Sequence, residues 1–205
     1  MKSAKLFPMF LKMAGRPCLV VGAGAVAESK IASLAETGAK VRVIAPEATE
    51  QVRSWAKTKK IEWQRRGFQP EDLAGMFLVV AATSSRELHG EILKEARRRA
   101  VLCNIVDVPE LCDFFYPAVV QRGALQIAIS TSGRSPALAQ RLRKALEEQF
   151  GREYEEWIEQ LADERGEQQV RDSDPEERKR LRHEQASEEA FEVFRRKRKE
   201  SKRAK

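Results

Sequence analysis

The sequence predicts an α/β protein with a doubly wound parallel sheet, because apolar strand-like runs alternate with helical patterns over residues 18–116. The five strand candidates lie at 18–22, 41–45, 61–65, 77–83 and 101–107. Helical spacing of apolar residues fills the intervals at about 25–37, 47–58 and 86–99. We expect right-handed crossovers between the parallel strands.

A second region follows the alternating part. Residues 125–130 form one more strand candidate, and Ser135 is a candidate N-cap with Pro136 in the first helical turn. Apolar residues then recur at helical spacing, at Leu138, Leu142, Ala145 and Leu146. From about residue 163 the composition becomes charge-dense, which predicts an extension that is helical in part and frays at its end.

Length and composition set the broad class of the protein. The 205 residues suffice for one large domain, or for one domain with an extension. The apolar runs are far shorter than the ~20 residues of a membrane span, and the N-terminus lacks a small-residue cleavage site. The three cysteines and two histidines show no zinc-site spacing. We therefore expect a mature cytoplasmic protein without a membrane segment or a dedicated metal site.

The positive charge is concentrated at one end of the chain. Residues 195–205 carry eight Lys or Arg and one Glu, whereas the remaining residues carry 30 basic and 30 acidic side chains. A basic tail can bind nucleic acid or an anionic membrane. Such a tail is more often a solvated end, so we expect neither nucleic acid nor membrane as a partner.

A glycine motif follows the first strand candidate. Gly22, Gly24 and Ala27 match the pattern G-x-G-x-x-G/A between a predicted strand and a predicted helix. The first glycine allows a tight turn, the second lets a pyrophosphate approach the backbone, and the third position permits close helix–strand packing. The amides near Ala25 and Val26 then point at the phosphates. The motif predicts a dinucleotide site.

The end of the second strand candidate offers an adenosine-side contact. Pro46 and Glu47 lie where an acidic residue can hold a ribose hydroxyl, although Glu47 can instead start the next helix. Arg42 lies inside the strand and is not placed to bind a 2′-phosphate. NAD is therefore favoured over NADP as the cofactor.

Thr83 closes the fourth strand candidate within the run "AATSS". Ligands of such sheets bind outside the carboxyl ends of the strands, so this run is placed to border the nicotinamide half of the cofactor. Ser84 or Ser85 can at the same time cap the helix that starts near Arg86.

These motifs and three later ones resemble the precorrin-2 dehydrogenase family, which includes the dehydrogenase/ferrochelatase module of siroheme synthases. The pattern G-x-G-x-V-A-x-x-K is followed by N-x-V-D and F-x-x-P-A in "CNIVDVPELCDFFYPA", and by S-x-x-G-x-S-P-x-L-A in "STSGRSPALA". The resemblance covers about residues 5–150. It implies a Rossmann domain at 1–116 and a dimerisation and helical region at 117–162, and it leaves 163–205 as a charged, partly helical or disordered extension.

The resemblance also implies an activity. Family members oxidise precorrin-2 to sirohydrochlorin with NAD+, and some also insert Fe2+ to give siroheme; their dimers are intertwined. By resemblance, Ala25 and Val26 contact the cofactor phosphates, Pro46 and Glu47 contact the adenosine side, and Asp107 is the catalytic aspartate. Trifunctional synthases continue into a methyltransferase domain, whereas a short charged extension follows here, so we expect no methyl transfer.

Asp107 suits a general base, because it follows an apolar strand candidate near the cofactor. We expect it to be partly buried beside Val106 and Val108. Asp107 can alternatively be a turn former before Pro109. The aromatic residues at 114–116 can flank the flat macrocycle, but they are more often core or interface residues.

The substrate implied by the resemblance carries eight carboxylates, so cationic side chains should surround the cleft. The loop at 130–136 lies near the tetrapyrrole site in the family, which makes Ser132 and Arg134 the candidate substrate-binding residues. Arg122 and Arg141 are the next candidates, and each of these arginines can also be an ordinary surface charge.

Two other function classes remain open. A non-catalytic sensor would bind NAD(H) and signal through its basic tail without oxidising precorrin-2. A different small-molecule dehydrogenase on the same fold is the other class, since fold does not decide function. The absence of a Tyr-x-x-x-Lys pair and of a catalytic histidine from the core disfavours that class.

Overall fold

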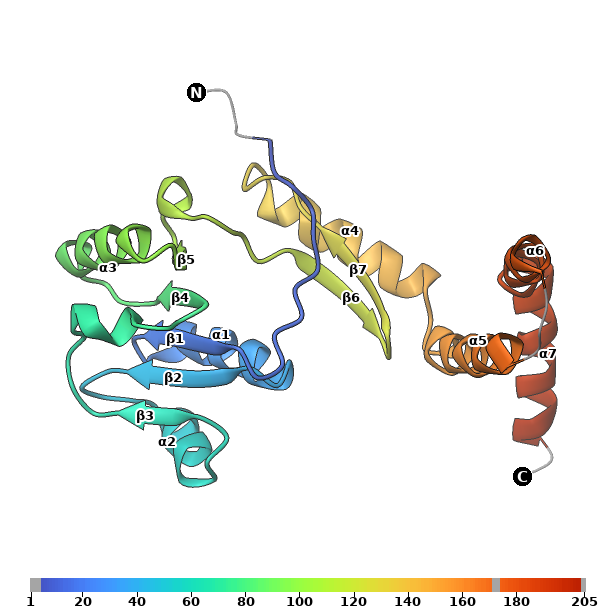
Figure 1. Cartoon of the computed structure of the whole chain (residues 1–205), viewed down its shortest axis with the longest axis horizontal. Coiled ribbons are helices and arrows are strands. Elements are labelled where there is room, and N and C mark those ends of the chain that lie inside the picture. Colours follow the sequence, from blue (N-terminus) through green and yellow to red (C-terminus); the bar gives the residue numbers. More distant parts are fainter. Residues whose placement is uncertain (1–4, 171–173, 204–205) are drawn as a thin grey trace. The chain divides into compact units, whose positions relative to one another are not determined.

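The computed structural model describes residues 5–170 and 174–203, and the chain divides into two compact units between Tyr116 and Pro117. The first unit holds a five-stranded sheet, and the second holds a two-stranded sheet and the C-terminal helices (Figure 1). Within the described residues, no helix is both long enough and apolar enough to cross a membrane.

The first unit is a parallel sheet with the strand order β3-β2-β1-β4-β5. The strands are β1 (Pro17–Val21), β2 (Lys40–Ile44), β3 (Glu62–Gln64), β4 (Leu78–Ala81) and β5 (Leu102–Ile105). The connecting helices are α1 (Ala25–Glu36), α2 (Glu50–Lys57) and α3 (Arg86–Arg98), with 3-10 turns η1 (Pro70–Leu73) and η2 (Pro109–Leu111). This is a Rossmann-type order with its switch point between β1 and β4, so the predicted doubly wound sheet is confirmed.

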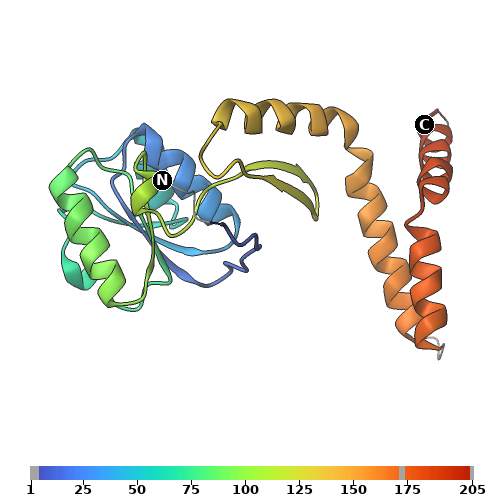
Figure 2. The same ribbon diagram turned by 90° about the horizontal axis from the view of Figure 1, so that it is seen from above.

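Alternate residues of the central strands pack into two separate cores. Cys18 and Val20 of β1 pack in the core that contains α1 and α2, whereas Leu19 and Val21 pack in the core that contains α3. Figure 2 shows the sheet lying between α1 and α3. Because helices cover both faces, the central strands are continuous apolar runs rather than alternating ones.

Two helices of the first unit, α2 and α3, end in the same hydrogen-bonded motif. After α3, the amide of Val101 donates to the carbonyl of Ala96 (2.9 Å), and Ala100 between them has a left-handed φ of 55°. Helix α2 ends in the same way, with the amide of Lys60 donating to the carbonyl of Trp55 (2.9 Å) and Lys59 (φ 57°) in the left-handed position; Gly38, just after α1, is also left-handed (φ 76°). Glycine adopts this conformation without strain, whereas alanine and lysine do not.

The exchange Ala100→Gly should therefore raise the free energy of unfolding by about 1 kcal/mol, because it removes this strain at an exposed position. The same chemical change inside α1, Ala32→Gly, should lower it by about 1 kcal/mol. Urea denaturation of both variants measures the difference. A loss of stability in both would show that the backbone at Ala100 carries no strain.

The second unit begins with an antiparallel hairpin of β6 (Ala118–Arg122) and β7 (Leu125–Ile129). Strand β7 was predicted, but β6 was not, because its apolar run is only three residues long. Helix α4 (Pro136–Gln149) packs on the hairpin. Ser135 is its N-cap, as predicted, and its hydroxyl accepts a hydrogen bond from the amide of Leu138 (3.3 Å).

The charged C-terminal region forms α5 (Glu153–Val170), α6 (Pro175–Gln185) and α7 (Glu188–Arg203). Helix α5 runs across the boundary expected at 162/163, and the end expected to fray includes residues 204–205, which lie outside the described residues. Phe191 of α7 packs its ring on Tyr154 and Trp157 of α5, with centroids 4.4 and 4.5 Å away. Arg198 of the basic tail forms an ion pair with Glu156 of α5 (2.6 Å between Nη2 and Oε1). Part of the tail's charge therefore serves helix packing.

Candidate dinucleotide and catalytic site

The loop from Gly22 to Gly24 joins β1 to α1 at the carboxyl edge of the sheet, beside the switch point. Gly22 has a φ of 106°, and a Cβ on it would lie 2.2 Å from the carbonyl oxygen of Ala82, just after β4. Its amide donates to the carbonyl of Ile44 at the end of β2 (2.9 Å). Only glycine fits this position, because the loop passes directly against the backbone of a neighbouring strand end.

The first turn of α1 is open to a ligand. Side-chain hydroxyls cap the N-termini of four other helices, those of Thr49, Ser85, Ser135 and Ser187. Gly24, the N-cap of α1, makes no side-chain hydrogen bond, and a Cβ on it would meet nothing within 4 Å. Ala25 and Val26 behind it are exposed. Amides left without such a cap, with room in front of them, fit the pyrophosphate of a dinucleotide.

Substitution by alanine should have different effects at Gly22 and at Gly24. Gly22→Ala should lower the free energy of unfolding by about 1–3 kcal/mol from backbone strain alone, because the new Cβ overlaps Ala82. Gly24→Ala should change stability by no more than about 0.5 kcal/mol but weaken NAD+ binding, because its methyl group fills the space in front of the amides. Denaturation and calorimetric titration with NAD+ separate the two effects. Unchanged NAD+ affinity in Gly24→Ala would contradict the assignment.

A loop separates the end of β2 from the next helix. Arg65 donates from Nε to the carbonyl of Pro46 (3.2 Å), and Glu47 is exposed beyond it. Helix α2 begins only at Glu50, after the N-cap Thr49. The alternative interpretation that Glu47 starts this helix is therefore wrong, and contact with the ribose stays a prediction for Pro46 and Glu47.

Hydrogen bonds with Ser85 and His89 hold the loop after β4 in place. The hydroxyl of Thr83 accepts a hydrogen bond from the amide of Ser85 (3.3 Å), and Ser85 caps α3, as one of the two serines was expected to do. The carbonyl of Thr83 lies 2.7 Å from Nε2 of His89, which is buried. In the tautomer protonated at Nε2, His89 donates this bond. Sequence reasoning gave His89 no role at this loop, although it lies only six positions after Thr83.

Asp107 lies in a turn just beyond β5. The amide of Val108 donates to the carbonyl of Ile105 (3.2 Å), and Asp107 has a left-handed φ of 63°. Val106 packs in the core on the α1 side and Val108 packs in the core on the α3 side. The expected partial burial of Asp107 is wrong: its neighbours are held on opposite faces of the sheet, and Asp107 itself is exposed. The turn-forming and catalytic interpretations are compatible, and the catalytic role stays a prediction.

This backbone conformation decides which variant of Asp107 is informative. Asparagine tolerates the left-handed region, so Asp107→Asn should change the free energy of unfolding by no more than about 0.5 kcal/mol. Alanine tolerates it poorly, so Asp107→Ala should cost about 1 kcal/mol. Chemical denaturation of both variants tests this expectation. Equal stabilities would show that the turn does not constrain this residue.

The neighbouring acid Asp113 has a structural role. Its carboxylate accepts a hydrogen bond from the amide of Cys103 (2.9 Å), and its own amide donates to the Cys103 carbonyl (2.8 Å). It thus satisfies the outer edge of β5, the last strand of the sheet. Asn104 donates from Nδ2 to the carbonyl of Phe114 (2.8 Å) and ties the following segment to the strand.

The cysteines of the sheet are packing residues. Burial raises the pKa of the Cys103 thiol to about 12 and that of Cys18 to about 11, so both stay protonated. Among the residues that the structure describes, no group of three or more His, Cys, Asp and Glu side chains is arranged to hold a metal ion.

The predicted substrate loop lies in the second unit. Ser132 and Gly133 both have left-handed φ angles (53° and 75°), and the amide of Arg134 donates to the carbonyl of Thr131 (3.0 Å). This tight turn leaves Ser132 and Arg134 exposed just before α4. Their contact with a substrate stays a prediction.

Arg122 has a structural use that the sequence did not indicate. Its guanidinium donates to the carbonyls of Phe150 (2.8 Å) and Glu147 (3.0 Å), which caps the C-terminus of α4. Arg141 lies exposed on α4. Of the three arginines considered for substrate carboxylates, Arg122 is thus engaged in holding the hairpin to this helix.

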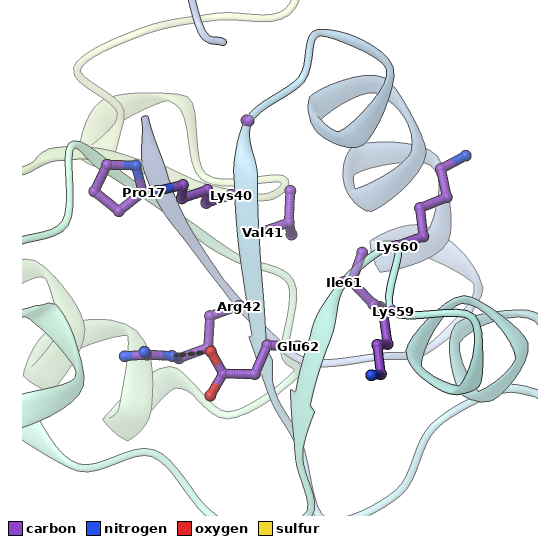
Figure 3. A pocket seen from close by; sticks show the side chains of 9 residues that line it. Pro17, Lys40, Val41, Arg42, Lys59, Lys60, Ile61 and Glu62 are labelled. Atoms are coloured by element: carbon purple, nitrogen blue, oxygen red, sulfur yellow. Dashed lines mark hydrogen bonds and ion pairs between the residues drawn. The ribbon is translucent and has the colours of Figure 1, made fainter. Parts of the chain in front are cut away.

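A hollow of about 380 Å³ lies at the opposite edge of the sheet, where β1, β2 and β3 begin (Figure 3). The charged side chains that line it do not point toward a common centre. Arg42 pairs with Glu62 (3.0 Å), and the ammonium of Lys60 lies 5.5 Å from the ring centroid of Trp55. In Figure 3 the side chains of Arg42 and Lys60 point away from each other. A dinucleotide binds at the carboxyl ends of such strands, so this hollow is not its site.

The strand order, the glycine loop and the uncapped start of α1 define a Rossmann-type dinucleotide-binding protein. Residues 9–118 match a family model described as putative NAD(P)-binding, and residues 122–149 match one described as sirohaem biosynthesis protein central. The chain belongs to this NAD(P)-binding family.

Similar proteins bear out the resemblance stated from the motifs. A siroheme synthase of Nitrosococcus oceani is 42% identical over 140 residues, and one of Neisseria meningitidis is 40% identical over 141 residues. These matches cover 68% and 69% of this chain but only 30% and 29% of the relatives, so the chain spans about 30% of their length. The solved structure of SirC, a precorrin-2 dehydrogenase, is 26% identical, with a TM-score of 0.78 over 89% of this chain and 90% of that chain.

Proposed function

We propose that this protein oxidises precorrin-2 to sirohydrochlorin with NAD+ in siroheme biosynthesis. The observation that carries the proposal is the likeness to SirC, a precorrin-2 dehydrogenase, which extends over 89% of this chain and 90% of that one. The matches to siroheme synthases cover a smaller part, 140 or 141 residues. The likeness thus spans both the NAD(P)-binding unit and most of the second unit.

The reaction removes a hydride and a proton from the macrocycle. Bound NAD+ accepts the hydride. Gly22, Gly24, Ala25 and Val26 would hold its pyrophosphate, with Thr83 bordering the nicotinamide half, and Pro46 and Glu47 the adenosine. Asp107 would accept the proton: its carboxylate is exposed beyond the carboxyl end of β5, which neighbours β4 on the cofactor side of the sheet.

Ser132 and Arg134 would bind carboxylates of the substrate. An exposed guanidinium on a tight turn suits bidentate pairing with a carboxylate. In this proposal the protein is a homodimer, which the exposed apolar side chains of the N-terminal segment support: Phe7 is 79% exposed and Phe10 is 66% exposed. Three free cysteines support a reducing, cytoplasmic location.

The direct test supplies purified precorrin-2 and NAD+ and follows NADH formation. The wild-type protein should turn over, and Asp107→Asn should lower the rate by about 10²–10⁴-fold with NAD+ affinity unchanged, because a general base is lost. Glu110→Gln, which alters an exposed acid on the adjacent turn η2, is the matched control and should keep the wild-type rate.

The outcomes separate the alternatives. A full rate in Asp107→Asn would refute the role of the base. Tight NADH binding without oxidation by the wild-type protein would support the sensor function instead. Adding Fe2+ to the sirohydrochlorin product in the same assay determines whether the protein also forms siroheme, with iron as a substrate rather than a resident metal.

A further inference from the structure

Two side chains at the end of β3 bind the backbone that follows β2. The two strands are parallel neighbours, so both end at the carboxyl edge of the sheet (Figure 1). Trp63 donates from Nε1 to the carbonyl of Ala45 (3.0 Å), and Arg65 donates from Nε to the carbonyl of Pro46 (3.2 Å). The guanidinium of Arg65 is thus held against the segment that we propose contacts the adenosine.

Arg65 and the next residue, Arg66, are used differently. Arg66 donates from Nη1 to the buried carboxylate of Asp72 (2.8 Å) and from Nη2 to the side-chain oxygen of Gln64 (2.6 Å). Arg65 is exposed, and within residues 5–170 and 174–203 its Nη atoms make no hydrogen bond and it pairs with no carboxylate. Arg66 therefore stabilises the fold, whereas the two Nη groups of Arg65 can bind a ligand.

The end of β2 decides which ribose a Rossmann-type site accepts. An acidic residue there binds the 2′-hydroxyl of NAD, and an arginine nearby accommodates the 2′-phosphate of NADP. Ala45 and Pro46, which follow the strand, are not acidic, and Glu47 comes only after them. Arg42, inside β2, is paired with Glu62 (3.0 Å). Arg65 reaches this position from β3, so the sequence of β2 alone does not reveal it.

We propose that Arg65 is a specificity-determining residue: its guanidinium binds the 2′-phosphate of NADP+, so the protein takes NADP+ as a second cofactor beside NAD+. The assignment rests on the proposed function, which places the adenosine at Pro46 and Glu47. Two parallel N–H groups are the arrangement in which arginine binds phosphate oxygens. The Nε hydrogen bond already orients this fork, so binding costs less side-chain freedom.

NAD+ remains the preferred cofactor in this proposal. The negative charge of Glu47 opposes a 2′-phosphate, and Arg65 offsets that repulsion rather than removing it. Hydride transfer is the same for both cofactors, because they differ only at the adenosine end and the nicotinamide is unchanged. Arg65 therefore acts on cofactor binding and not on the chemical step.

The first test measures binding of NADH and NADPH to the full chain by nicotinamide fluorescence, without substrate. Arg65→Gln should weaken NADPH binding by about 10–100-fold, the loss of one or two hydrogen bonds to a charged group, and leave NADH binding unchanged. Arg97→Gln makes the same change at an exposed arginine in the last turn of α3, at the other edge of the sheet, and should affect neither.

The second test measures oxidation of precorrin-2 with each cofactor. In Arg65→Gln the KM for NADP+ should rise by about 10–100-fold while kcat stays unchanged, because the lost contact is made equally in the ground state and the transition state. The KM for NAD+ should not change. Glu47→Gln should lower the KM for NADP+, since it removes the opposing charge.

The outcomes separate this proposal from the function on which it rests. Binding of NADH but not of NADPH by the wild-type protein would overturn the role of Arg65 and leave the proposed function intact. Equal weakening of both nucleotides in Arg65→Gln would also overturn it, because it would show that Arg65 only holds the segment at Pro46. Failure of the wild-type protein to bind either nucleotide would refute the proposed function and this assignment together.

Discussion

The site depends on one close backbone crossing, where Gly22 passes the carbonyl of Ala82. A Cβ at this glycine would lie 2.2 Å from that oxygen, so the ends of β1 and β4 can meet only because the side chain is absent. The crossing turns the chain into α1 beside the switch point of the sheet, where the first-turn amides of α1 face outward. The proposed contacts of Gly24, Ala25 and Val26 with the cofactor phosphates follow from that placement.

The end of β5 shows a second constraint of the same kind. Val106 and Val108 are held in cores on opposite faces of the sheet, and the residue between them projects past the sheet edge in a left-handed turn. Asp107 is thus presented by the packing of its neighbours rather than by contacts of its own.

Charged side chains in the second unit stabilise its own helices. Arg122 caps α4, and the ion pair between Arg198 and Glu156 joins α7 to α5 beside the aromatic cluster around Phe191. A sequence rich in charge at its C-terminus is therefore compatible with packed helices, provided that basic and acidic residues lie on facing helices. The composition of this region alone did not indicate that pairing.

The sequence by itself was enough to predict a doubly wound parallel sheet, the glycine loop, the cap at Ser135 and the family resemblance. Each of these depends on residue types at short spacing. Tertiary structure decided the rest. It assigned Asp113 to the edge of β5, exposed Asp107 and brought Lys30 to Tyr116. Lys30 and Tyr116 are 86 positions apart in the chain, and no local periodicity records such a contact. Only the crossover of the chain through the sheet brings the two residues together, which is why their contact could not be predicted from sequence.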